Sequence, residues 1–267
     1  MRFTRQRPAC ESRRCLFFLR MMLKEINMKN ELFFNDYLGF KVNSRKTMLP
    51  ENRTGSLLTG MIGAGEIPVY ADCLSTGLPS RISMETMFRE WAIRNKEEAV
   101  RIIAWLKAEG CRELYRKYYP FIDPGISPSE CKQRTAEKYT DGSCRESIIY
   151  PFSHSIYSLY SCMRFMENHP DFAFTRNNLP STVIAWDMSR LILLARLCFD
   201  CGYLTERQAW EHIIEADRRA WKNYTGIQGF FMGCLSGCAF SNGRNEKFDN
   251  CLRTVEKWAW LYSNSIV

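Results

Sequence analysis

The 267-residue sequence lacks any long uninterrupted run of apolar residues. A membrane-spanning helix needs about 20 such residues, and no segment supplies them, so we expect no membrane span. A secretory signal needs roughly 7–15 uninterrupted apolar residues and a small-residue cleavage site. The apolar patch at residues 16–19 is interrupted by Arg20, and no such cleavage site follows it. The sequence therefore predicts a cytoplasmic protein.

Histidine is scarce, and this scarcity weighs against several enzyme classes. The chain contains His154, His169 and His212, and no two of them form an H-x-x-x-H or H-E-x-x-H pattern. Isolated histidines are poor support for a metalloenzyme or a Ser-His-Asp hydrolase. The segment 60–65 reads Gly-x-x-Gly-x-Gly but lacks the Gly-Lys-Ser/Thr ending of a phosphate-binding loop. We interpret it as a flexible loop and expect no cofactor.

Excess charge is also confined to one part of the chain. The formal charge is +8, but residues 1–27 carry seven basic and two acidic residues, a net charge of +5, so the other 240 residues carry only +3. The body is nearly balanced, and we expect no nucleic-acid partner. Two interpretations of residues 1–27 stay open: an over-extended start, with translation beginning at Met28, or a basic interaction tail.

The 12 cysteines are spread along the chain without the tight spacing of a disulfide scaffold. We expect most of them to be reduced thiols that fill the core. Two pairs, Cys198 with Cys201 and Cys234 with Cys238, are spaced as zinc ligands are. Both pairs lie inside apolar helical patterns rather than in turns, so core filling is favoured and no metal is expected.

The periodicity of the sequence predicts a mainly α protein with one multi-helix domain. Residues 28–82 are rich in glycine and proline, and we expect an irregular N-terminal segment there. Residues 83–262 show a helical pattern, interrupted by a long connection over 120–150 that we expect to contain one short helix. The run 181–201 is apolar on nearly every side, as expected of a central buried helix. The other expected helices cover 84–93, 95–110, 129–138, 153–167, 205–223, 227–240 and 245–262.

Several motifs in the helical part occur together. One block reads Trp-Asp-x-x-Arg at 186–190, Ala-Arg at 195–196, Gly-Tyr-Leu at 202–204 and Ala-Trp at 209–210. A second block lies upstream, with Trp-Ala-Ile at 91–93, Trp-Leu at 105–106 and Glu-Gly-Cys-Arg at 109–112. Together these blocks resemble the bacterial domain-of-unknown-function family 1266 (DUF1266), over roughly residues 83–262. The resemblance implies a fold and a set of polar residues, and it implies no established activity.

The chain departs from the family pattern at three places. It has Gly237-Cys238 where Gly-Arg is usual, Gly110-Cys111-Arg112 where Gly-His-Arg is usual, and Gln208 where an acidic residue is common. A polar site shared by the family would therefore lack some of its members in this chain.

The candidate polar cluster consists of Asp187, Arg190, Arg196, Arg112 and Tyr203. Asp187 and Arg190 share a helix face, whereas Arg196 lies on the opposite one. One interpretation is structural, with these charges tying the central helix to its neighbours, because buried ion pairs are common without any site. The other is an anion-recognition cleft in which an arginine grips phosphate or carboxylate in bidentate fashion.

These observations favour a non-enzymatic protein-binding module whose partner is another protein. The alternative is an enzyme, a hydrolase or transferase, acting on a phosphate-bearing or other anionic substrate. In that case Asp187, Arg190 and Arg196 would line the cleft, and a small anionic ligand would bind there.

Overall fold

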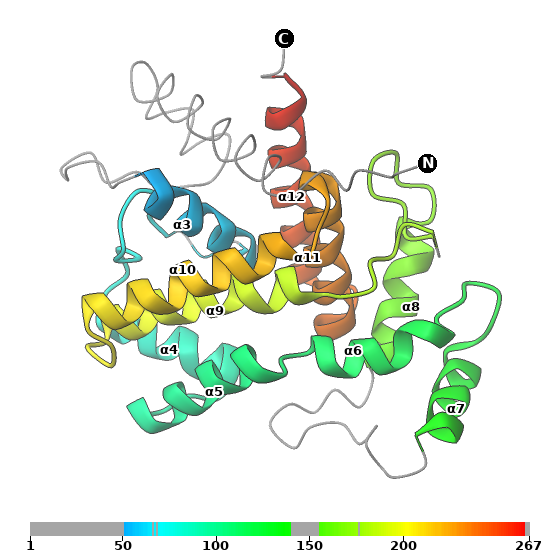
Figure 1. The fold of residues 1–267 in the computed structure, drawn as a ribbon, viewed down its shortest axis with the longest axis horizontal. Helices are drawn as coiled ribbons and strands as arrows, with labels where there is room; N and C mark the ends of the chain where they lie inside the picture. The colour runs from blue at the N-terminus through cyan, green and yellow to red at the C-terminus, as the bar shows by residue number, and fades with distance from the viewer. Residues whose placement is uncertain (1–50, 66, 68, 140–154, 176, 265–267) are drawn as a thin grey trace, which may run out of the picture.

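The computed structural model describes residues 51–65, 67, 69–139, 155–175 and 177–264. Within these ranges the chain forms helices and no β-strand (Figure 1). The α-helices are α3 (Glu51–Ala64), α4 (Ser80–Trp91), α5 (Lys96–Ala108), α6 (Arg112–Tyr118), α7 (Pro128–Lys138), α8 (Ser155–Met166), α9 (Ile184–Asp200), α10 (Glu206–Lys222), α11 (Gly226–Asn242) and α12 (Glu246–Asn264), and a 3₁₀ turn, η2 (Tyr119–Phe121), follows α6.

Helix α9 is the centre of the fold. Fifteen consecutive residues, Ile184–Cys198, are buried, because the helix is apolar on almost every side and is covered on every side. In Figure 1, α10 runs alongside α9, α3 lies on one side of the pair, and α4 and α5 lie on the other. The mainly α class and the central buried helix predicted from the sequence are confirmed.

Local capping signals place two of the helix starts. The side chain of Asn95 accepts a hydrogen bond from the backbone N–H of Glu98 at 2.9 Å at the start of α5. At the start of α10, Thr205 accepts from the N–H of Gln208, and the Gln208 side chain accepts from the N–H of Thr205. These reciprocal bonds satisfy backbone N–H groups that the first turn leaves without partners. Both helices begin where the sequence predicts.

Helix α3 contains Gly60 and Gly63, so the interpretation of the segment 60–65 as a flexible loop is wrong. A Cβ at Gly63 would lie 2.7 Å from the carbonyl carbon of Ser189, and one at Gly60 would lie 2.3 Å from Cγ2 of Ile192. The glycines therefore let the backbone of α3 approach α9 closely, and they do not form a flexible loop. Glycine favours loops in an isolated sequence, but here it is selected by helix packing.

Between α3 and α4 the described residues form no further helix, as expected of an irregular segment. The expectations for residues 1–50 lie outside the described residues. Within the part that is described, no helix combines the length and apolar composition needed to cross a lipid bilayer.

Candidate functional site

Asp187 lies at the first turn of α9 and is fully buried. One carboxylate oxygen accepts a hydrogen bond from the backbone N–H of Cys111 at 3.0 Å. The other accepts from the backbone N–H of Arg112 at 3.1 Å and from its Nη1 at 2.9 Å. The carboxylate thus binds the N-terminus of α6 and one guanidinium at once, an arrangement that stabilises a buried negative charge.

Arg112 completes this arrangement by binding the end of α5. Its Nη1 donates to the carbonyl of Leu106 and its Nη2 to that of Lys107, each at 2.8 Å. Gly110 stands between the two helices with a φ of +59°, and a Cβ there would lie 2.1 Å from Oδ2 of Asp187. The Glu-Gly-Cys-Arg motif is therefore the elbow between α5 and α6, and Asp187 fixes this elbow to α9.

Arg190 is only 6% exposed and lies among aromatic rings. Its Cζ is 5.0 Å from the ring centroid of Trp91 and 5.6 Å from that of Trp186. Its Nη2 also donates to the carbonyl of Glu90 at 3.5 Å. These contacts join α9 to the end of α4 through cation–π interactions.

Arg196 is 1% exposed and is surrounded by backbone carbonyls. Its guanidinium donates to the carbonyl oxygens of Tyr70, Cys73, Leu74 and Ser75, with distances of 3.0–3.1 Å for the last three. Burial lowers the pKa of Arg196 to about 10, so the group stays protonated at neutral pH. The charge orders the connection between α3 and α4.

The structure brings Arg112 and Asp187 together but separates them from the rest of the predicted cluster. Nine residues of helix place Arg196 about 14 Å farther along α9 than Asp187. Tyr203 lies beyond the end of α9, where its backbone N–H donates to the carbonyl of Cys198 at 2.8 Å. Arg112 and Asp187 thus share one place, whereas Arg196 and Tyr203 lie farther along α9 and beyond its end.

The four cysteines considered as zinc ligands fall into two places. Cys198 is next to Met87 of α4, and Cys201 donates to the carbonyl of Ser80. Cys234 of α11 instead lies beside Ser189, in the N-terminal half of α9, and Cys238 follows one turn later on α11. Burial raises the pKa of Cys198 to about 12 and that of Cys201 to about 11, which disfavours the thiolate that binds metal. Among the described residues, no group of three or more His, Cys, Asp or Glu side chains is arranged to hold a metal ion.

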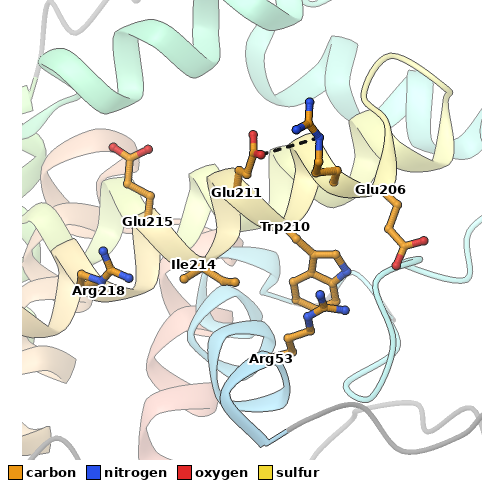
Figure 2. A pocket seen from close by; sticks show the side chains of 8 residues that line it. Arg53, Glu206, Trp210, Glu211, Ile214, Glu215 and Arg218 are labelled. Atoms are coloured by element: carbon orange, nitrogen blue, oxygen red, sulfur yellow. Dashed lines mark ion pairs between the residues drawn. The ribbon is translucent and has the colours of Figure 1, made fainter.

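An open groove of about 640 Å³ lies between the start of α3 and the outer face of α10. Figure 2 shows it from close by, with the indole of Trp210 and the guanidinium of Arg53 facing each other. The Cζ of Arg53 is 4.7 Å from the indole centroid, and Trp210 is 4% exposed. The other lining residues are Glu206, Arg207, Glu211, Ile214, Glu215 and Arg218. The groove thus combines aromatic and apolar surface with charges of both signs.

Sequence reasoning did not find this groove. From the sequence, Trp210 belongs only to the Ala-Trp motif at 209–210. No sequence feature points to Arg53, because it lies in residues 28–82, which are predicted to be irregular.

A polar network behind the groove also escaped the sequence analysis. Asp217 of α10 accepts hydrogen bonds from Ser56 at 3.0 Å and from Thr59 at 2.6 Å. Trp221 donates to the Thr59 hydroxyl at 3.1 Å. Burial raises the pKa of Asp217, although these hydrogen bonds oppose the shift. The network therefore joins α3 to α10, and it holds the Asp217 carboxyl where burial disfavours the ionised form.

Asp217→Asn is expected to change how stability depends on pH. A carboxyl whose pKa is raised by folding binds its proton more readily in the folded state. Its contribution to stability is therefore present below the unfolded pKa and is lost as pH rises through the folded pKa. Relative to Asp217→Asn, the wild-type protein should gain unfolding free energy as pH falls from 7 toward 4. Urea unfolding at a series of pH values measures this difference, and parallel curves for the two proteins would contradict it.

Comparison with known proteins identifies a family for most of the chain. The family described as "Protein of unknown function (DUF1266)" matches residues 87–265. This range contains α5 to α12, together with the Asp187–Arg112 pair. Helix α3 lies outside it. No curated protein and no solved structure matches the chain.

Proposed function

The chain belongs to the DUF1266 family of proteins of unknown function, and we propose that it is a non-enzymatic module that binds another protein through the groove between α3 and α10. The observation that carries this proposal is the make-up of the groove. Its walls combine Trp210, Ile214 and Arg53 with exposed charges of both signs. Tryptophan and arginine dominate the energetics of protein interfaces, and mixed charges at the rim give specificity to a docking partner.

The charges of α9 bear on the enzyme alternative. Asp187, Arg190 and Arg196 are buried, and each contacts a different neighbouring segment. Their contacts are those of groups that hold helices together. The alternative of an enzyme acting on an anionic substrate stays a prediction, and these contacts give it no support.

We propose the cytoplasm of a bacterium as the setting for this function. The nine cysteines of the described ranges are free thiols, and eight of them are buried. Reduced thiols in this number are typical of a reducing compartment.

Site-specific photo-crosslinking is the test of the groove as a docking site. A photoreactive amino acid placed at Glu211, on the rim, is expected to form a discrete adduct with one cellular protein. The matched control places it at Arg101, an exposed position on α5, and should not form that adduct. The absence of an adduct at Glu211, or the same adducts at both positions, would refute the proposal.

A further inference from the structure

The guanidinium of Arg53 contacts the indole of Trp210 as a bound cationic ligand would. The guanidinium lies over the indole face at 4.7 Å from its centroid. Trp210 is only 4% exposed, and its Nε1 is buried without a hydrogen-bond partner among the described residues. The indole N–H and a guanidinium are both donors, so this N–H reports on the site without binding the cation itself. The position of Arg53 shows that this end of the groove accommodates a planar cation over the indole face.

A carboxylate stands beside the indole. Glu206 is exposed at the start of α10, and Figure 2 shows its side chain on the same side of the helix as Trp210 and Arg53. Within the part of the chain that the structure describes, no ion pair engages Glu206 or Arg53. By contrast, Glu211 faces Arg207 at 3.9 Å, and Glu215 contacts Lys107. Of these three carboxylates, Glu206 is thus the one without an ion pair among the described residues, and it lies on the same side of α10 as the indole.

We infer that Trp210 and Glu206 form a recognition site for a guanidinium or ammonium group, supplied by an arginine or lysine of a partner polypeptide. Indole is the aromatic ring that best attracts a cation, and a carboxylate beside it forms a charge-assisted hydrogen bond. In the free protein, Arg53 occupies this site as an internal stand-in for the partner's side chain. The inference rests on the proposed function and names the chemistry of its partner.

Arg53 is placed so that a partner can displace it. It is the third residue of α3, it is half-buried, and helix ends open more readily than helix centres. Arg218 also lines the groove, at the end away from Glu206 in Figure 2, and repels a second cation near it. This charge favours the Trp210–Glu206 end as the place for a basic side chain.

A titration of the full-length protein with the tripeptide amide Ac-Gly-Arg-Gly-NH₂ tests this inference. The readout is the Nε1–H resonance of Trp210 in a ¹H–¹⁵N spectrum, assigned by its loss in Trp210→Phe. Arg53→Ala removes the internal competitor and should lower the Kd for the tripeptide at least fivefold. Adding Glu206→Gln to that variant should raise the Kd again, at least threefold.

Controls separate this effect from unspecific charge effects. Arg81→Ala removes an exposed arginine that pairs with Glu85 on α4 and should leave the Kd unchanged. If Arg53→Ala perturbs folding, Arg53→Gln serves in its place, because it keeps most of the aliphatic stem. An unchanged Kd in the Arg53 variants, or an equal shift of the resonance by Ac-Gly-Asp-Gly-NH₂, overturns the inference.

The two proposals fail in distinguishable ways. If the tripeptide binds as expected but Glu211 yields no protein adduct, the cation site stands and the protein-binding function fails. If an adduct forms but the tripeptide does not shift the Trp210 resonance, the groove binds a protein by other contacts and the inference is wrong.

Discussion

Replacing Asp187 with alanine is expected to lower the free energy of unfolding by about 3–5 kcal/mol, the usual cost of removing one partner of a buried ion pair. The loss would leave Arg112, whose side chain is 11% exposed, without its counter-charge. It would also leave the backbone N–H groups of Cys111 and Arg112 without acceptors. Urea unfolding of the full-length protein measures the change.

The double variant Asp187→Ala/Arg112→Met is the control for this prediction. Because it removes the orphaned cation as well, it should be less destabilised than the sum of the two single changes. A loss below about 1 kcal/mol in Asp187→Ala would contradict the structural role. In that case the interpretation of Asp187 as part of an anion-binding cleft would regain support.

Gly63→Ala is expected to destabilise the protein by about 3 kcal/mol, at the upper end of the usual cost of overpacking. The new methyl group would lie within 2.8 Å of three backbone atoms of Ser189 and Arg190. Backbone in the middle of a buried helix cannot move aside as a flexible side chain can, so α3 must shift away from α9. This shift would also disturb the hydrogen bonds from Ser56 and Thr59 to Asp217.

Gly229→Ala is the matched control for the glycine prediction. Gly229 also lies within a helix, α11, but a Cβ there meets only the side chain of Tyr224 at 3.7 Å. Alanine favours helix over glycine by up to about 1 kcal/mol, so this variant should be as stable as wild type or more stable. Equal destabilisation by both changes would show that helix glycines, and not the close approach of α3 to α9, explain the loss.

Much of the helical part could be predicted because its signals are local. The capping residues Asn95 and Thr205 and the stop at Gly202 lie within a few residues of the helix ends that they define. Buried stripes such as Ala209, Trp210 and Ile213 recur at the helical period and are buried in the structure. Local periodicity was misleading for α3, because its glycines serve a contact with a helix 126 or more residues away in sequence. The short helix α6 is also absent from the helices expected from the sequence.

The candidate site was less predictable, since each of its contacts joins distant segments. Arg112 lies 75 residues before Asp187, and the carbonyls around Arg196 come from residues more than 120 positions earlier. From the sequence, the charges on α9 could form either a cleft or a set of packing contacts. Arg53 and Trp210 meet only because α3 lies against α10, which no local pattern indicates.

The sequence by itself determined that this protein is a helical member of its family, where most helices begin and end, and that α9 is buried. It could do so because helix caps and apolar periodicity depend on neighbours within one or two turns. Only the tertiary structure decided which neighbours the buried charges contact and where an open surface remains. Those outcomes depend on which distant carbonyl, carboxylate or ring each buried charge meets, and burial makes such pairing obligatory.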